Sequence, residues 1–177
     1  MRHSDIAYVL VRVHAQGEDH LLLHRHAKWG DWTLVGGHVE AGEERDWCLA
    51  AAREANEELP WHLGCDFEVD RLELAVQWGP EPSRSASGEP TKYRAEYFLL
   101  RFLRDPRDLL RALPESEFRL VPLSALSGGT NLDVSTPVRL LMERVGTSLG
   151  EVPRSWHAEL AGVATPRAGR DAAESGR

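Results

Sequence analysis

The sequence contains few cysteines and no long apolar segment. Its two cysteines, Cys48 and Cys65, are too few for a disulfide framework and do not show the spacing of a metal-binding pair. No apolar stretch approaches the roughly 18 residues that a membrane span needs, and residues 1–5 do not resemble the start of a signal peptide. We therefore expect a cytoplasmic protein, in a reducing setting, that does not cross a membrane.

Positive charge is also scarce, because 21 lysines and arginines face 28 acidic residues and leave a net charge of -7. Binding along nucleic acid needs a basic face, so no nucleic-acid partner is expected. A polyanionic small molecule remains compatible with this charge, since a bound metal ion can reverse the local field. The length of 177 residues suits one domain, which we place at residues 1–163. Residues 164–177 have the composition of a disordered tail.

The apolar patterns predict both strands and helices along the chain. Strands are expected at 6–14, 20–26, 32–35, 67–78, 93–103 and 117–123, and helices at 46–59, 105–113 and 136–145. Residues 79–91 are rich in proline, glycine and serine and predict a mobile binding loop. This order predicts an α/β (α+β) domain in which helices pack on a mixed β-sheet.

The helix predicted at 46–59 carries a cluster of negative charge. Glu54, Glu57 and Glu58 are spaced i, i+3 and i+4, which places them on one face of the helix. Because like charges repel at this spacing, a divalent cation with oxygen ligands is the natural counter-ion. The opposite, core-facing stripe is predicted to consist of Cys48, Ala52, Ala55 and Leu59.

These carboxylates belong to a longer motif. The glycine-rich segment 36–43 (GGHVEAGE), followed by segment 53–58 (REANEE), resembles the Nudix box of the Nudix hydrolase family. The spacer between Glu43 and Arg53 is two residues longer than in the family, and Pro60 stands where the family has a helix-ending glycine. Two residues added inside a helix would rotate its preceding part by about 200°. We therefore expect the extra length in the loop before the helix, around residues 44–47.

The resemblance implies a Nudix-type α/β/α sandwich and a metal-dependent hydrolase. Such an enzyme is a pyrophosphatase, which cleaves the diphosphate linkage of a nucleoside diphosphate derivative with Mg²⁺, or with Mn²⁺ in its place. A nucleoside triphosphate, ADP-ribose, a sugar nucleotide and a dinucleoside polyphosphate are all open as substrates. The expected partner is a small-molecule nucleotide, and a homodimer is left open.

The resemblance also implies the residues of the site. The metal ligands would be Glu54, Glu57 and Glu58, together with the backbone carbonyl of Gly37 or Gly36. Arg53 would pair with Glu43 or Glu54 and fix the geometry. The general base would be Glu54 or Glu96, so the catalytic set is Glu54, Glu57, Arg53 and Glu96, with Glu43 and Gly36 as structural support.

Three further residues are candidates for substrate binding. His38 adjoins the glycine turn and would contact phosphate, whereas a polar surface role is the alternative. Trp32 and Trp78 would stack on a nucleobase, as aromatic side chains do, and core packing is the alternative for both.

Two other functions compete with hydrolysis. A Nudix-fold binding or regulatory module would sense a nucleotide without cleaving it, but degenerate members of this kind lose carboxylates that the chain retains. A Nudix-fold isomerase of prenyl diphosphates would need a catalytic cysteine beside a strand, and neither cysteine has such a context. The intact set of carboxylates therefore favours the hydrolase.

Overall fold

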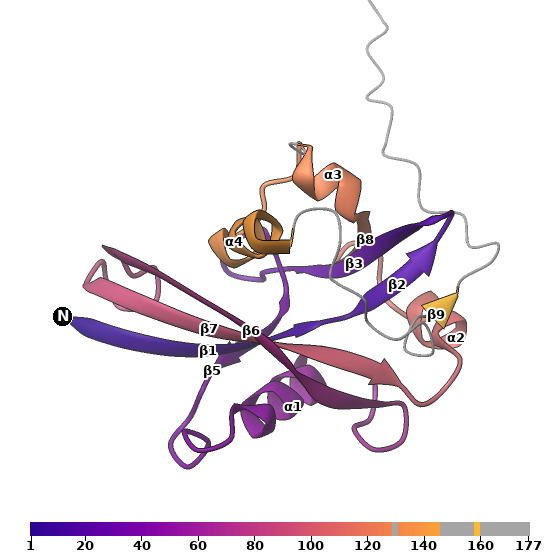
Figure 1. The fold of residues 1–177 in the computed structure, drawn as a ribbon, viewed down its shortest axis with the longest axis horizontal. Helices are drawn as coiled ribbons and strands as arrows, with labels where there is room; N and C mark the ends of the chain where they lie inside the picture. The colour runs from indigo at the N-terminus through magenta and orange to yellow at the C-terminus, as the bar shows by residue number, and fades with distance from the viewer. Residues whose placement is uncertain (129–130, 146–157, 160–177) are drawn as a thin grey trace, which may run out of the picture.

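The computed structural model describes residues 1–128, 131–145 and 158–159, and two β-sheets form its centre (Figure 1). The first sheet has the order β5-β1-β7-β6, with bounds Val35–His38, Arg2–Leu10, Pro90–Phe102 and Phe67–Pro82. The second has the order β4-β3-β2-β9, with bounds Trp32–Thr33, Glu18–Arg25, Arg12–Ala15 and Ala158–Glu159, and β8 (Phe118–Pro122) also pairs with β3. The predicted tail, 164–177, lies outside the described residues.

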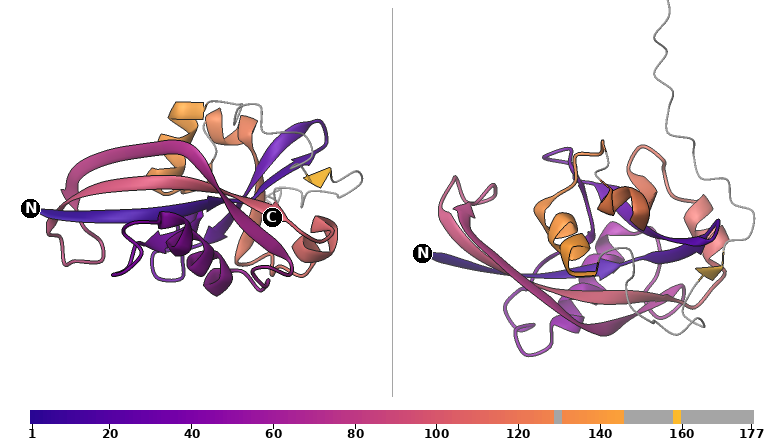
Figure 2. Two further views of the ribbon diagram at one scale, coloured as in Figure 1. Left: turned by 60° about the horizontal axis from the view of Figure 1, so that its bottom comes forward. Right: turned by 45° about the horizontal axis from the view of Figure 1, so that its top comes forward.

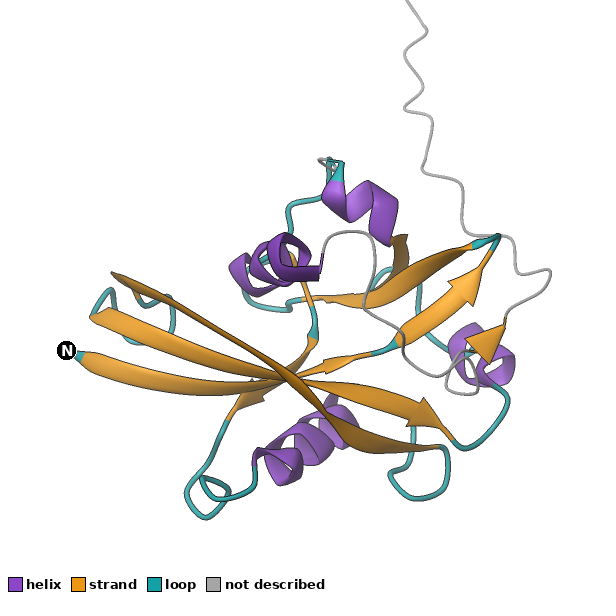
Figure 3. Ribbon diagram, viewed as in Figure 1, coloured by secondary structure: helices purple, strands orange, loops and turns teal. Residues whose placement is uncertain are grey.

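The first sheet is mixed and has helices on both sides. Strand β1 runs parallel to β7 and antiparallel to β5, and β6 is antiparallel to β7. Figures 1 and 2 place α1 on one side of this sheet and α4 on the other, and Figure 3 separates helices from strands by colour. The helices are α1 (Trp47–Glu58), α2 (Pro106–Arg111), α3 (Leu123–Ser127) and α4 (Thr136–Val145). The predicted mixed fold is thus confirmed.

Alternating side chains of β1 supply the two larger cores of the domain. Ala7 and Val9 pack on the α1 side, whereas Ile6 and Tyr8 pack on the side of α4. This division follows from the two-residue period of a strand, whose successive side chains point to opposite faces.

Two predicted strands are each divided between the sheets. The strand predicted at 6–14 is in fact β1, which ends at Leu10, and β2, which begins at Arg12. The strand predicted at 32–35 is likewise divided, because Leu34 separates β4 from β5. Neither break contains a glycine or a proline, so the sequence shows no turn signal where the chain changes sheets.

The prediction of a long loop at residues 79–91 is wrong. Strand β6 extends to Pro82 and β7 begins at Pro90, which leaves a turn of residues 83–89. A shift in register between Trp78 and Glu81 accommodates Pro80, which has no N–H to donate. The turn is closed by its own bonds, because the Ser83 amide donates to the Glu89 carbonyl at 3.0 Å.

The predicted core face of α1 is right in part, because Ala55 and Leu59 are buried as expected. The helix buries Trp47, Ala50, Ala51 and Ala55, whereas Cys48 and Ala52 are only half-buried. Trp47 provides the largest apolar surface of the helix, and its burial sets the rotation. Glu54 and Glu58 follow Ala50 and Ala51 at helical spacing, so they border the buried face instead of lying opposite it. No helix among the described residues is long and apolar enough to cross a membrane.

A close backbone contact joins β5 to β1 at Gly36. Its φ is +139°, and a Cβ atom there would lie 2.2 Å from the Ala7 carbonyl oxygen. We expect Gly36→Ala to lower the free energy of unfolding by about 3 kcal/mol, because it adds a backbone overlap to an unfavourable φ. Gly42→Ala is the control, since Gly42 has a φ of +100° but nothing within 4 Å of the added atom. Denaturant titration of both variants checks this, and equal losses would contradict it.

Candidate active site

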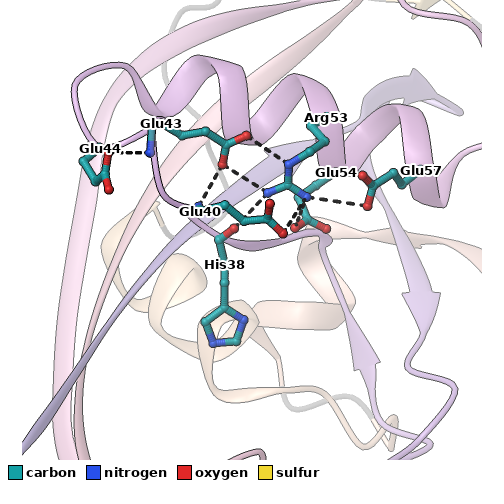
Figure 4. A network of polar contacts seen from close by, with 8 residues as sticks. His38, Glu40, Glu43, Glu44, Arg53, Glu54 and Glu57 are labelled. Carbon is teal, nitrogen blue, oxygen red and sulfur yellow. Dashed lines mark hydrogen bonds and ion pairs between the residues drawn. The ribbon is translucent and has the colours of Figure 1, made fainter.

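Arg53 is the centre of a polar network that joins α1 to the loop before it (Figure 4). Its Nε and Nη2 donate to the two carboxylate oxygens of Glu43 at 2.9 and 3.1 Å. Its Nη1 donates to Glu54 Oε1 at 2.8 Å, and Nη2 also donates to the His38 carbonyl at 3.0 Å. The bond from Arg53 lowers the pKa of Glu43. Arg53 therefore contacts both Glu43 and Glu54, the two alternatives expected as its partner.

The loop from 39 to 46 is held at both of its ends. Glu43 Oε2 accepts from the Glu40 amide at 2.9 Å, and the Asp46 side chain caps α1 by accepting from the Cys48 amide at 3.1 Å. The helix is continuous from Trp47 to Glu58. The three carboxylates Glu54, Glu57 and Glu58 thus keep their helical spacing, and the position of the two additional residues stays a prediction.

The three carboxylates of α1 differ in exposure. The side chains of Glu54, Glu58 and Glu57 are 14%, 28% and 58% exposed. Glu54 lies against Gly37, where an added Cβ atom would be 2.4 Å from Glu54 Oε1. Glu58 Oε2 accepts from the Gly36 amide at 3.0 Å. The glycine pair thus allows the backbone of β5 to approach two carboxylates closely.

Negative charge in this cluster is incompletely compensated. Burial, followed by the charges of Glu54 and Glu57, raises the pKa of Glu58 to about 7. His24 Nε2 lies 3.4 Å from Glu58 Oε2, but burial lowers the pKa of His24 to about 4 and keeps the imidazole neutral near pH 7. Arg53 is shared among Glu43, Glu54 and Glu57, whose Oε2 lies 3.5 Å from Nη1.

The donor set of this cluster fits a divalent cation. Carboxylate and backbone carbonyl oxygens are the ligands that Mg²⁺ and Mn²⁺ accept, and a cation would relieve the crowding of like charges. Across residues 1–128, 131–145 and 158–159, no three His, Cys, Asp or Glu side chains already converge as a ligand group. The fit therefore rests on the chemistry of the donors and on the buried, uncompensated charge.

The raised pKa of Glu58 predicts a loss of stability as the pH rises. A carboxyl whose pKa is higher in the folded state than its usual 4.5 binds more protons when folded, so stability falls between about pH 4.5 and 7. Glu58→Gln removes this titration and keeps an acceptor for the Gly36 amide. In EDTA, we expect the free energy of unfolding of the variant to exceed that of the parent protein by about 2–3 kcal/mol at pH 8. The two values should be equal near pH 4.5. Urea unfolding across this range tests the prediction, and a constant difference would contradict it.

Glu96 belongs to β7, two strands away from β5 in the first sheet. It is in one row with Ala7 and Gly37 across the first sheet, so it faces the same side as α1, about 10 Å from β5. Its carboxylate pairs with Arg94 Nη2 at 2.5 Å and with Arg71 Nη2 at 3.6 Å. The role of Glu96 as a base stays a prediction.

A cavity of about 450 Å³ opens on the other side of β1. Trp78 and Tyr93 line it from the first sheet, with their rings stacked at 4.9 Å, and Trp29 and Asp31 line it from the β3–β4 connection. Glu58 also borders this cavity, along with the predicted residues Gly36, Gly37 and His38. The cavity therefore connects with the carboxylate cluster through the glycine pair.

The two tryptophans predicted to bind substrate have different surroundings. Trp78 lines the cavity, whereas Trp32 is not among its lining residues. Trp32 is half-buried and packs against the core, with the Arg119 guanidinium 4.9 Å from its ring. Tyr93, Asp31 and Arg84 also line the cavity, although no motif in the sequence singled them out. Trp78 pairs with Tyr93 in the β6–β7 hairpin, so a predicted hairpin would have identified Tyr93 as a second aromatic residue of the cavity. No local pattern distinguishes Asp31 or Arg84.

The chain was also compared with known proteins. The model of the NUDIX domain family matches residues 2–141. A NUDIX hydrolase from Nitrosomonas europaea has a TM-score of 0.52 and 18% identity, over 83% of this chain and 92% of that one. A mutT/nudix family protein from Listeria innocua has a TM-score of 0.50 and 20% identity, over 81% and 90%.

A third solved structure, Shewanella oneidensis NrtR, has a TM-score of 0.52 and 15% identity, over 79% of this chain and 60% of that chain. No curated protein sequence matches the chain. At these identities the structural likeness shows the fold alone, whereas the family model covers most of the chain. The chain therefore belongs to the NUDIX domain family and to its class of enzymes, the Nudix hydrolases.

Proposed function

We propose that this Nudix hydrolase cleaves the diphosphate linkage of a nucleoside diphosphate derivative and uses Mg²⁺ or Mn²⁺. One observation carries the proposal: Glu54 and Glu58 flank the Gly36–Gly37 backbone where the 450 Å³ cavity meets the acidic face of α1. A volume of this size suits a nucleoside. Its position beside acidic ligands suits a diphosphate that reaches them with a cation.

The charged residues divide between binding and positioning. Glu57 and Glu58 would hold the cation, with Glu54 and the Gly37 carbonyl beside them. When bound, a divalent cation offsets the charge of the diphosphate and acidifies the attacking water. Arg53 would position Glu54 through its direct bond and would fix the loop through Glu43. Glu54 and Glu96 stay the two candidates for the general base.

The cavity orients the substrate in this proposal. The nucleoside would lie between the two sheets, against Trp78, and its phosphates would extend past Gly37 and His38 to the α1 carboxylates. This arrangement leaves open a nucleoside triphosphate, ADP-ribose, a sugar nucleotide or a dinucleoside polyphosphate, because each carries a nucleoside and a diphosphate.

A substrate panel tests the proposal. The protein is incubated with members of the four substrate classes, with Mg²⁺, with Mn²⁺ or with EDTA, and the products are separated by ion-exchange chromatography. We expect metal-dependent cleavage of at least one substrate between two phosphates. Tight nucleotide binding without any turnover would overturn the proposal and would favour a regulatory module.

A further inference from the structure

One buried carboxylate of the cavity has a free acceptor. Asp31 is 4% exposed, and its Oδ2 accepts from Arg84 Nη1 at 2.8 Å. Its Oδ1 is buried and has no hydrogen-bond partner. A buried acceptor without a partner is unfavourable, and native proteins rarely retain one without a reason. Because Asp31 lines the cavity, a ligand bound in the cavity could donate a hydrogen bond to Oδ1 and supply the missing partner.

The walls of the cavity indicate which part of a nucleotide reaches Asp31. On the first sheet, the Trp78 and Tyr93 rings stack with an angle of 11° between their planes. On the β3–β4 connection, the His26 and Trp29 rings stack at 3.9 Å. Flat aromatic walls suit a nucleobase, which has two π-faces, better than a sugar.

Arg84 adds a donor beside the acceptors of Asp31. It belongs to the turn 83–89 between β6 and β7, and its guanidinium lies 5.6 Å from the centre of the Trp29 ring. The pair therefore presents a donor next to a carboxylate, both at the cavity. Guanine has the matching edge, because the acceptor O6 is followed by the donors N1–H and N2–H. Adenine instead has the acceptor N1 beside its amino group, and N1 would face a carboxylate oxygen.

We propose that Asp31, together with Arg84, reads the edge of a guanine-type base and is the specificity-determining residue of this enzyme. The inference rests on the proposed function only in that the substrate is a nucleotide. It requires no cleavage, so it can be tested with nucleoside monophosphates, which have no diphosphate linkage.

The experiment measures binding of GMP and AMP by calorimetry, with Mg²⁺ in all samples. We expect the parent protein to bind GMP at least about 10-fold more tightly than AMP. In Asp31→Asn, we expect GMP to bind about 10- to 100-fold more weakly, while AMP binds more tightly. An amide can donate to adenine N1 and accept from its amino group, so this change reverses the preference. Asp108→Asn, at an exposed aspartate of α2, is the matched control and should change neither affinity.

Arg84→Gln keeps the test decisive if Asp31→Asn does not fold, because the Arg84 side chain is 62% exposed. We expect this variant to reduce the preference for GMP. Equal binding of GMP and AMP by the parent protein would overturn the inference. Equal weakening of both ligands in Asp31→Asn would also overturn it, because it would indicate a ribose contact or a structural role. A failure of the proposed function would instead appear as absent cleavage in the substrate panel, with the preference for GMP intact.

Discussion

Replacing Glu57 with glutamine is expected to lower kcat/KM for the best substrate by about 10²- to 10⁴-fold, which corresponds to several kcal/mol of transition-state stabilisation. Glutamine keeps the size of the side chain and removes its charge. A neutral amide is a poor ligand for a hard cation beside a diphosphate. The Glu57 side chain is 58% exposed and lies 3.5 Å from Arg53 Nη1, so the fold depends little on its charge.

The effect should be confined to catalysis. We expect the melting temperature of Glu57→Gln to stay within a few degrees of the parent value, and more Mg²⁺ to be needed for half-maximal activity. Glu143→Gln, at an exposed glutamate of α4, removes the same charge from another helix and should leave kcat/KM unchanged. An unchanged rate in Glu57→Gln with an authentic substrate would show that Glu57 is not a metal ligand.

The motif around α1 could be predicted because its information is local. The limits of the helix, the spacing of its carboxylates and the pairing of Arg53 with Glu43 all follow from residues within one short segment. The buried face could be predicted in this way only in part, since the pattern predicts Ala55 and Leu59 in the core but not Trp47, Ala50 and Ala51. It depends on Trp47, which the position of the helix on the first sheet brings into the core, and this rotation moves Glu54 and Glu58 to the border of the buried face.

The division of the chain between two sheets depends on distant partners. Residues 6–14 form one apolar pattern, but β1 pairs with β5 and β7, whereas β2 pairs with β3. Most of the cavity has the same long-range origin. Tyr93 lies opposite Trp78 only through the register of β6 and β7, and Asp31 meets Arg84 across 53 positions of the sequence. A local pattern contains no information on either contact.

Replacing Arg53 with alanine is expected to lower kcat/KM by about 10²- to 10³-fold, although Arg53 would not bind the cation itself. Its guanidinium simultaneously contacts both oxygens of Glu43, one oxygen of Glu54 and the His38 carbonyl. Without it, Glu54 loses its orienting bond and Glu43, in the loop from 39 to 46, loses its two bonds to α1. We also expect the free energy of unfolding to fall by about 2 kcal/mol, measured by denaturant titration.

Arg53→Lys distinguishes a positioning role from a simple need for positive charge. A single ammonium group keeps the charge but cannot bind Glu43 through two parallel bonds and also reach Glu54. We therefore expect Arg53→Lys to recover less than a tenth of the lost activity, with kcat affected more than KM. Arg45→Ala, at an exposed arginine of the same loop, is the matched control and should retain full activity. Full activity in Arg53→Lys would contradict the positioning role, because charge alone would then account for the contribution of Arg53.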